Sequence, residues 1–332
     1  MILNQWYAIA PSSEVKKNNI SAIRRCGLDL ALWRNDKGEL GCVVDLCSHR
    51  HVKLSLGELK NNCLMCPFHG LEFAADGSCQ FVPSIGKGFQ NNIDRFNVKA
   101  YKVKEAHGII YLFYGDFDLA PDSLPFFNDI DDTWTYSEIL DVWDTHYSRA
   151  IENQLDVLHL PFIHRKTIGR GNKTLVNGPK VVFEDETLRT SASNAVDIGQ
   201  KPLTSEECEV SDKIHLRFKF PNLWMNHISE KIRIIIYFAP VDDEQTHMYI
   251  RFYTKQTPFK IVNRLIAQVG AFANRKIEEE DKRVVVTHSP KLSSFKSDEQ
   301  LLPGDRPIII YRQMREKLKN NLQHIIILKE KD

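Results

Sequence analysis

The stretch CSHRHVKLSLGELKNNCLMCPFHG, from Cys47 to Gly70, places cysteine beside histidine in two short groups. The first group is Cys47-Ser-His49 and the second is Cys66-Pro-Phe-His69. Structural zinc sites usually take like ligands in pairs, with two cysteines from one turn and two histidines from one helix. Each group here mixes the two types. The pattern therefore indicates two facing loops that each supply one thiolate and one imidazole.

A two-iron, two-sulfide cluster can have this ligand demand, because one iron takes both thiolates and the other takes both imidazoles. The spacing is Cys-x-His, then sixteen residues, then Cys-x-x-His, and CPFHG completes the second loop. It resembles the Rieske iron–sulfur family. That resemblance implies one [2Fe–2S] cluster held by Cys47, His49, Cys66 and His69. A zinc knuckle built from the same residues is the alternative interpretation.

Two neighbours compete for ligand roles. His51 offers Cys-x3-His, and Cys63 forms Cys-x-x-Cys with Cys66, a spacing typical of redox or zinc pairs. We expect neither to be a ligand. The resemblance is weaker at two positions, because relatives often carry a small or apolar residue in place of His51 and tryptophan in place of Leu71.

Composition bounds the class of protein. The chain has 332 residues, 42% apolar content and a net charge of +1, so it can bury a core and divide into two domains. The near-neutral charge and the absence of a long Lys/Arg stripe predict neither a nucleic-acid nor a membrane partner. We therefore expect a small-molecule ligand.

The seven cysteines and the N-terminus predict a cytoplasmic protein. Five of the cysteines lie between Cys42 and Cys79, which suggests metal in a reducing compartment rather than disulfides. The start MILNQWYAIAPSSEVKK lacks the basic and long apolar segments of a secretory signal.

The pattern along the chain predicts an α+β protein. Residues 1–118 contain short apolar segments separated by turn residues, as in a small all-β domain. After a connection at 117–132, residues 119–332 form the second domain, which opens with the strand-like TYSEILDVWDTHYS. The runs KIHLRFKF, KIRIIIYF and HMYIRFYT indicate an antiparallel sheet, the last two joined as a hairpin.

One long helix is expected from Phe259 to about Val285. Apolar residues recur at 262, 265, 269, 272, 273 and 277, so we expect this face to pack on the sheet in a helix-grip arrangement. The tail REKLKNNLQHIIILKEKD is expected to be a short helix or a frayed end.

A second metal site is expected in IENQLDVLHLPFIHRKT. Asp156 and His159 are three residues apart on an expected helix that Pro161 then breaks, so His164 can turn back toward His159. Two imidazoles and one carboxylate on Fe(II) leave positions open for dioxygen and substrate. A single histidine here would more often be a hydrogen-bonded core side chain, and the pair favours the metal.

The pattern Asn153-x-x-Asp156-x-x-His159-x4-His164 after a Rieske module resembles the catalytic (alpha) subunit of Rieske non-haem iron oxygenases, over essentially the whole chain. Asn153 and the modest length are more similar to the monooxygenase and O-demethylase branch. The resemblance implies a mononuclear Fe(II) held by His159 and His164.

The third ligand is sought in the acidic run Glu278 to Asp281. Helical projection against Ala273 and Ile277 places Glu280 closest and Asp281 next, whereas the resemblance favours an aspartate in a Glu-Asp-Lys context. We choose Asp281 and keep Glu280 as the alternative. Glu278 and Glu279 are expected to lie on a solvated surface.

The resemblance implies four further features. Asp156 bridges the two centres by accepting hydrogen bonds from His69 and from a histidine on the iron. The bridge joins neighbouring subunits of a homotrimer. Electrons come from NAD(P)H through an external ferredoxin or flavin reductase, since no G-x-G-x-x-G follows a strand in this chain. The reaction inserts oxygen from O2 into a C–H bond of a small organic substrate, by hydroxylation or oxidative demethylation.

Two alternatives come from other classes. The chain could be an electron-transfer protein whose second domain is catalytically silent, or a binding module with structural zinc at both sites. Neither needs a 2-His-1-carboxylate set with open positions.

Overall fold

The computed structural model describes residues 1–88, 90–169, 171–184 and 186–329, with side chains described up to residue 320. The chain forms two compact units. The first is built from Leu3–Leu124 together with Pro240–Asp242, and the second from Pro125–Ala239 and the residues that follow Asp242. The functional division into domains 1–118 and 119–332 remains a prediction.

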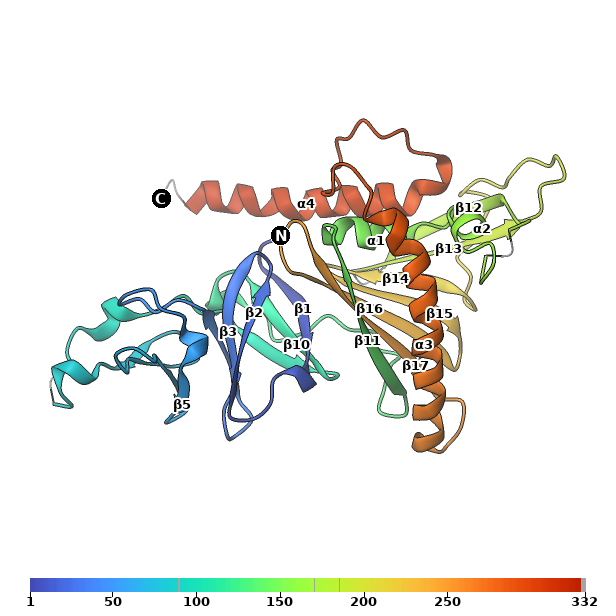
Figure 1. Cartoon of the computed structure of the whole chain (residues 1–332). Coiled ribbons are helices and arrows are strands. Elements are labelled where there is room, and N and C mark those ends of the chain that lie inside the picture. Colours follow the sequence, from blue (N-terminus) through green and yellow to red (C-terminus); the bar gives the residue numbers. More distant parts are fainter. Residues whose placement is uncertain (89, 170, 185, 330–332) are drawn as a thin grey trace. The chain divides into compact units, whose positions relative to one another are not determined.

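Three small antiparallel sheets form the first unit (Figure 1). The strands are short, and the most buried of them are rich in β-branched, leucine or aromatic residues, as in the IIYLFY of β10, of which five side chains are buried. The sheets are β1–β10–β9, β2–β3–β4 and β5–β6–β7–β8. Their strands are β1 (Gln5–Pro11), β2 (Asn19–Arg25), β3 (Leu28–Arg34), β4 (Leu40–Val44), β5 (Glu58–Lys60), β6 (Cys63–Met65), β7 (Glu72–Phe73), β8 (Cys79–Phe81), β9 (Val103–Ala106) and β10 (Ile109–Tyr114).

A seven-stranded antiparallel sheet is the frame of the second unit. Its strand order is β11–β17–β16–β15–β14–β13–β12. The strands are β11 (Thr135–Trp143), β12 (Leu175–Glu184), β13 (Thr187–Ala195), β14 (His215–Lys219), β15 (Leu223–Ser229), β16 (Ile232–Pro240) and β17 (Thr246–Thr254). The predicted neighbours β16 and β17 lie side by side, and the α+β class with an all-β first unit is confirmed.

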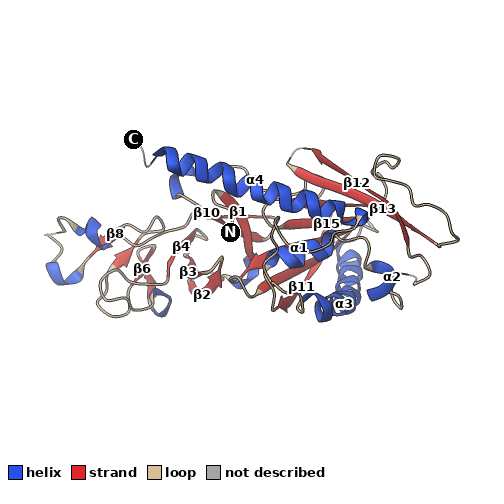
Figure 2. Ribbon diagram, turned by 90° about the horizontal axis from the view of Figure 1, so that it is seen from above, coloured by secondary structure: helices blue, strands red, loops and turns tan. Residues whose placement is uncertain are grey.

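The long helix α3 (Lys260–Val285) packs against β11 and β17, and Figure 2 views it nearly end-on beside the strands. The prediction that the apolar face of this helix packs on the sheet was wrong. Val262, Leu265, Val269 and Phe272 are exposed, whereas small and polar residues are buried. The buried set is Asn263, Ala267, Ala271, Asn274, Glu278, Asp281 and Val285.

Bulky strand side chains explain this inversion. A Cβ atom at Gly270 would lie 2.6 Å from the ring of Phe252 on β17, so the helix approaches the sheet too closely for a large residue there. Ala267 and Ala271 are 0% and 1% exposed beside it. The large side chain in this contact comes from the sheet, and the helix contributes the small residues.

Three shorter or later helices surround this frame: α1 (Tyr147–Leu155), α2 (Leu160–Ile163) and α4 (Arg306–Lys329). The expected helix RAIENQLDVLHL is interrupted, because α1 ends at Leu155 and the chain from Asp156 to His159 is not helical. The expected short tail helix is instead the long α4, and residues 330–332 of the tail lie outside the described part.

A buried ion-pair network joins α1 to α4. Arg312 on α4 donates to both carboxylate oxygens of Glu152 on α1, each at 2.8 Å, and its side chain is 4% exposed. Arg149 also reaches Glu152, at 3.2 Å, and Glu299 lies 2.7 Å from Arg149 and 2.6 Å from Arg312. The network anchors the helix that leads into Asp156 and His159. None of the helices in the described part combines the length and apolar character that a bilayer crossing needs.

We expect Arg312→Ala to lower the free energy of unfolding by about 3–5 kcal/mol, because it leaves the buried Glu152 carboxylate with half of its charge partners. Arg306→Ala on the same helix is the control. The Arg306 side chain is 49% exposed, and its ion pair with Glu206 is long, at 4.0 Å. Its loss should therefore lower the free energy of unfolding by less than about 1 kcal/mol. Urea unfolding followed by circular dichroism measures both, and equal effects would show that the network does not anchor α1.

Candidate metal centres

The two Cys/His loops of the first unit share one backbone design. In the first, the Cys47 N–H donates to the Val52 carbonyl (2.9 Å) and the His51 N–H donates to the Cys47 carbonyl (2.9 Å). The second repeats both bonds at the same spacing: Cys66 N–H to the Leu71 carbonyl at 2.8 Å, and Gly70 N–H to the Cys66 carbonyl at 3.1 Å. Each loop is therefore held by the backbone of its own cysteine.

The fourth residue after each cysteine has a left-handed backbone conformation. Gly70 has φ +72° and His51 has φ +57°. Glycine adopts this region without steric cost, and histidine is among the residues that tolerate it best. His51 thus occupies the structural position of Gly70, which gives this histidine a conformational role. Sequence comparison of the two loops at equal offset from the cysteines could have found it.

The loops sort their side chains by type. Cys47 and Cys66 are 1% and 2% exposed, within a core that includes Trp33, Leu64 and Phe73. His49 and His69 are exposed, and their ring centroids lie 4.7 Å apart. Two thiols face the interior and two imidazoles face outward, so the residues present fit a [2Fe–2S] cluster with its histidine-bound iron at the surface.

The protonation of the Cys47 thiol depends on whether a metal is bound. Burial is the main cause that raises the pKa of the Cys47 thiol to about 11, and the neighbouring Cys66 adds to it against a hydrogen bond from the His49 backbone, which lowers it. A bound cation reverses this preference, because a coordinated thiol is deprotonated. Cys63 on β6 is half-buried, and Leu71 is 2% exposed in the core beneath the loops.

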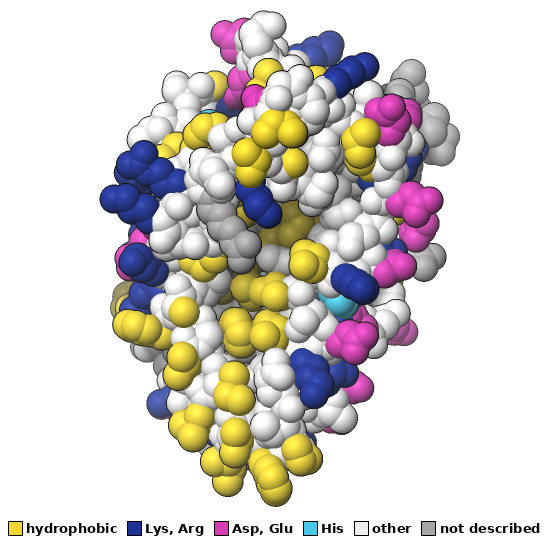
Figure 3. Space-filling view, turned by 90° about the vertical axis from the view of Figure 1, so that its right-hand side faces the viewer, with side chains coloured by type: hydrophobic (Ala, Val, Ile, Leu, Met, Phe, Trp, Pro, Cys, Tyr) yellow, Lys and Arg dark blue, Asp and Glu magenta, His cyan; other side chains and the backbone are white. Residues whose placement is uncertain are grey.

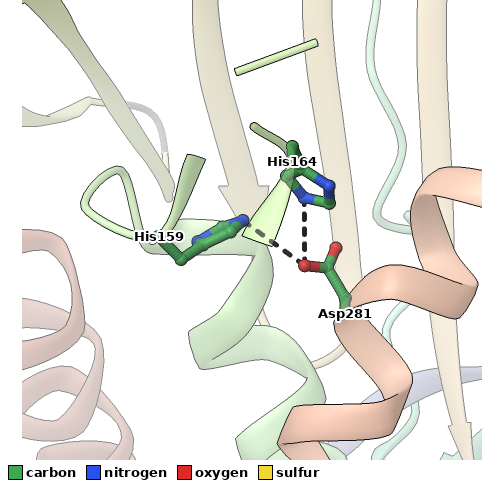
Figure 4. A group of neighbouring side chains, drawn as sticks. All are labelled: His159, His164 and Asp281. Atoms are coloured by element: carbon green, nitrogen blue, oxygen red, sulfur yellow. Dashed lines mark ion pairs between the residues drawn. The ribbon is translucent and has the colours of Figure 1, made fainter. Parts of the chain in front are cut away.

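In the second unit, His159, His164 and Asp281 come together, as Figure 4 shows. One ligand atom from each lies within 4.8 Å of the others. Asp281 Oδ1 is 3.0 Å from His164 Nε2 and 3.5 Å from His159 Nε2. This oxygen is buried and accepts no hydrogen bond from the described residues. Two ring nitrogens facing one orphaned carboxylate oxygen fit a divalent iron with open positions.

The short helix α2 creates this convergence. Pro161 stands in its first turn, where a proline is tolerated, and the helix is one turn long. His159 precedes α2 and His164 follows it, so both imidazoles reach the same point, with ring centroids 5.1 Å apart. Pro161 therefore starts a new helical turn and does not end the preceding one as expected.

Asp281 and Glu280 share His164. Asp281 faces its Nε2, whereas Glu280 Oε2 lies 2.8 Å from its Nδ1 and accepts a second hydrogen bond from Thr167 Oγ1, also at 2.8 Å. Burial alone would lower the pKa of His164, but the neighbouring carboxylates of Asp281 and Glu280 stabilise the protonated imidazole, outweigh burial and raise this pKa. Glu280 thus lies on the far side of the imidazole, where a carboxylate fixes the ring orientation and tautomer.

Asp156 lies between α1 and the histidines. Its Oδ1 accepts a hydrogen bond from the Leu158 N–H at 2.6 Å, and its Oδ2 is 3.3 Å from His159 Nδ1 without hydrogen-bond geometry. Asp156 and His159 do not share a helical face as expected, because residues 156–159 are not helical, but their side chains still lie next to each other. Asn153, on the last turn of α1, is 9% exposed, and its Nδ2 makes no hydrogen bond within the described residues.

The prediction that Glu278 is exposed to solvent was wrong. It was expected in solvent, but it is 3% exposed and accepts hydrogen bonds from Gln154 (3.2 Å) and Asn274 (3.4 Å). Burial, reinforced by the charges of Asp281 and Asp141, raises its pKa well above the ordinary value. Its offsets from Asn274 and Asp281 are four and three residues, which is the helical signal that could have revealed it.

A cavity of about 290 Å³ opens at the three converging residues. Most of the exposed surface of its wall is apolar, and it is interrupted by five amide side chains and by carboxyl groups. The amides are those of Asn153, Gln154, Asn194, Asn226 and Asn274, and the carboxyls are those of Asp156, Glu278 and Asp281. Such a wall binds a small organic molecule through burial, with a few polar groups that orient it. The apolar residues of the wall include Val157, Leu160, Ile168, Leu216, Trp224, Ile234 and Ile277.

Family models match both halves of the chain. Residues 5–102 match the Rieske [2Fe-2S] domain. Residues 143–321, more than half of the chain, match the vanillate O-demethylase oxygenase C-terminal domain. The chain belongs to the Rieske non-haem iron oxygenases. The resemblance drawn from the motifs, including the O-demethylase-like branch, is confirmed.

Relatives of this Rieske oxygenase include methylxanthine N1-demethylase NdmA of Pseudomonas putida, 26% identical over 95% of this chain and 88% of its own length. Chlorophyllide a oxygenase of Chlamydomonas reinhardtii is 34% identical over 51% of this chain and 25% of its own length. The chain spans between a quarter and about half the length of the first curated relatives that it matches. The solved structure of Pseudomonas putida CBB5 NdmA superposes with a TM-score of 0.78 and 22% identity, covering 97% of this chain and 92% of the other.

The position of His51 predicts how the cluster responds to substitution. His51→Gly should leave the visible absorbance of the cluster unchanged, because glycine adopts the same backbone. His51→Val should lower cluster content, since a β-branched residue at positive φ costs about 1–3 kcal/mol. If both variants lost the cluster, His51 would be a ligand instead.

The contact between Glu280 and His164 predicts a role in metal affinity. Glu280→Ala should weaken binding of ferrous iron at the mononuclear site by roughly 10–100-fold, as found when the carboxylate partner of a metal-binding histidine is removed. Glu279→Ala is the matched control, because that side chain is exposed. Competition with an iron chelator measures both. Complete loss of iron in Glu280→Ala, with retention in Asp281→Ala, would reverse the two assignments.

Proposed function

We propose that this chain uses O2 and electrons from an NAD(P)H-dependent reductase to hydroxylate or oxidatively demethylate a small, largely apolar organic substrate. The convergence of His159, His164 and Asp281 on an apolar cavity carries the proposal. An electron-transfer protein with a silent second domain has no use for this arrangement.

The metals are assigned to the residues that fit them. Cys47 and Cys66 would hold one iron of a [2Fe–2S] cluster, and His49 and His69 the other. The mononuclear Fe(II) would lie between the two histidines and the aspartate of the second unit. When bound, the cluster supplies single electrons and the mononuclear iron reduces dioxygen beside the substrate.

The protein's own groups orient the reaction. Glu280 holds His164 from behind through Nδ1, which leaves Nε2 for the metal. Glu278 is a buried carboxyl at the cavity wall, and burial raises its pKa well above the ordinary value, which favours the protonated form that can donate as well as accept a hydrogen bond. The apolar wall excludes water from the remaining space.

The electron path is proposed to cross between subunits through Asp156. Its carboxylate is held by the Leu158 N–H and faces the Nδ1 of His159, and 24% of the side chain is exposed. His69 is also exposed, so it is accessible to a carboxylate of another subunit. We infer a homotrimer in which His69 of one chain meets Asp156 of the next.

The electron source and location are further parts of the proposal. An external ferredoxin or flavin reductase supplies the electrons, and the protein works in the cytoplasm. The family model for an O-demethylase and the methylxanthine demethylase relative favour removal of a methyl group, which leaves as formaldehyde.

Anaerobically reconstituted protein should contain three irons per chain, two in the cluster and one at the mononuclear site. With a generic reductase and NADH, oxygen uptake should rise with one member of a panel of methoxylated and N-methylated compounds, and formaldehyde should form. His159→Ala should contain two irons, keep the spin-resonance signal of the reduced cluster and form no product.

Two results would contradict the proposal. Full turnover by His159→Ala would remove the mononuclear site from the reaction. A preparation that contains zinc and no iron would assign the chain to binding rather than catalysis.

A further inference from the structure

The exposed face of α3 is more apolar than its buried face. Ile261, Leu265, Val269 and Phe272 are 80%, 59%, 71% and 74% exposed. They recur at intervals of four, four and three residues, so they form one line along the helix, here called the apolar stripe. Figure 3 shows apolar side chains gathered over the lower part of this face. Isolated exposed apolar residues are ordinary, but an ordered line of four large ones indicates an interaction surface.

The charged residues of α3 along the stripe have one sign. Lys260, Arg264, Arg275 and Lys276 are exposed on the same part of α3. No aspartate or glutamate occurs between residues 259 and 277. The acids begin at Glu278, so the helix changes sign where it enters the metal site. Phe259, 68% exposed, extends the apolar surface at the start of the helix.

This combination fits a lipid surface better than a second copy of the chain. The surface proposed to meet a neighbouring subunit surrounds Asp156 and His159, beside Asp281. Ile261 is twenty residues before Asp281, which is roughly 30 Å along a helix. Phe272, at the other end of the stripe, is nine residues before Asp281 or roughly 14 Å, so the stripe extends along the helix away from that contact. Apolar residues inserted among lysine and arginine are the pattern of helices that lie in the plane of an anionic membrane.

We propose that residues 260–276 of α3, with the apolar stripe and its four cations, bind the surface of an anionic membrane. Ile261, Leu265, Val269 and Phe272 enter the boundary between headgroups and acyl chains, while the four cations contact lipid phosphates. The net charge of +1 predicted no such partner, because it averages over a chain in which this charge is local.

The cavity lies next in line on the same helix. Asn274, Ile277 and Glu278 of α3 line it, and two exposed isoleucines, Ile168 (54%) and Ile214 (62%), belong to its wall. In Figure 3 the surface is hollowed above the apolar side chains. A substrate dissolved in lipid would thus meet an apolar route to the cavity. This consequence rests on the proposed function, whereas the lipid contact itself does not.

Flotation of the metal-loaded full chain with vesicles tests the contact. We expect binding to vesicles of equimolar phosphatidylcholine and phosphatidylglycerol, weaker binding to pure phosphatidylcholine, and release by salt. Val269→Ser combined with Phe272→Ser should lower the partition coefficient by roughly tenfold or more, since buried apolar area drives insertion. Arg264→Gln combined with Lys276→Gln should lower it by a similar factor on anionic vesicles alone.

Ile198→Ser is the matched control, because Ile198 is 84% exposed in the loop after β13, outside the stripe and the cavity wall. It should bind like the parent chain. Absence of binding to any vesicle at low salt would overturn the proposal, as would binding that the stripe variants do not change. A smaller oligomer in the stripe variants, measured by light scattering, would assign the stripe to contact between copies. Iron content and cluster absorbance, measured on the same samples, report on the oxygenase assignment separately.

Discussion

Small side chains on one face of α3 let this helix lie close against β11 and β17, and the position of Asp281 depends on that contact. Asn263 fixes the start of the helix, where its amide donates to the Thr257 carbonyl at 2.8 Å and accepts from the Thr257 N–H at 3.0 Å. Lys282 fixes its end through Asp141 on β11, at 2.8 Å. Between these points Gly270 and its alanine neighbours admit the ring of Phe252. The carboxylate thereby arrives beside two histidines that come from a different part of the chain.

The same packing explains the unusual surface of α3. A helix that presents alanine, asparagine and acids to its sheet must carry its large apolar residues elsewhere, and here they face away from the sheet. The buried acids face groups that can compensate for their burial: Glu278 accepts hydrogen bonds from two amides, and one oxygen of Asp281 faces two imidazoles. Metal site and surface stripe are thus two consequences of one helix orientation.

The ligand types could be predicted from the sequence, but several of their surroundings could not. Cys47, His49, Cys66 and His69 are set by a spacing within one short segment, so local chemistry was enough to propose them. His159 and His164 are similarly close along the chain. Helical projection ranked Glu280 ahead of Asp281, whereas the structure shows that both carboxylates contact His164 and differ in which ring nitrogen they face. The orientation of α3 was predicted wrongly for another reason. Apolar periodicity identifies the apolar face of a helix, but this helix packs on the sheet through its other face.

Anomalous diffraction at the iron edge from crystals of the reconstituted protein tests the central claim, that α3 delivers Asp281 to a metal shared with His159 and His164. The account predicts one iron in the second unit, bound by Nε2 of both histidines and by Asp281, with Glu280 outside the coordination sphere and bonded to His164 Nδ1. An iron bound by Glu280, or no iron between these three residues in a protein that turns over substrate, would contradict it.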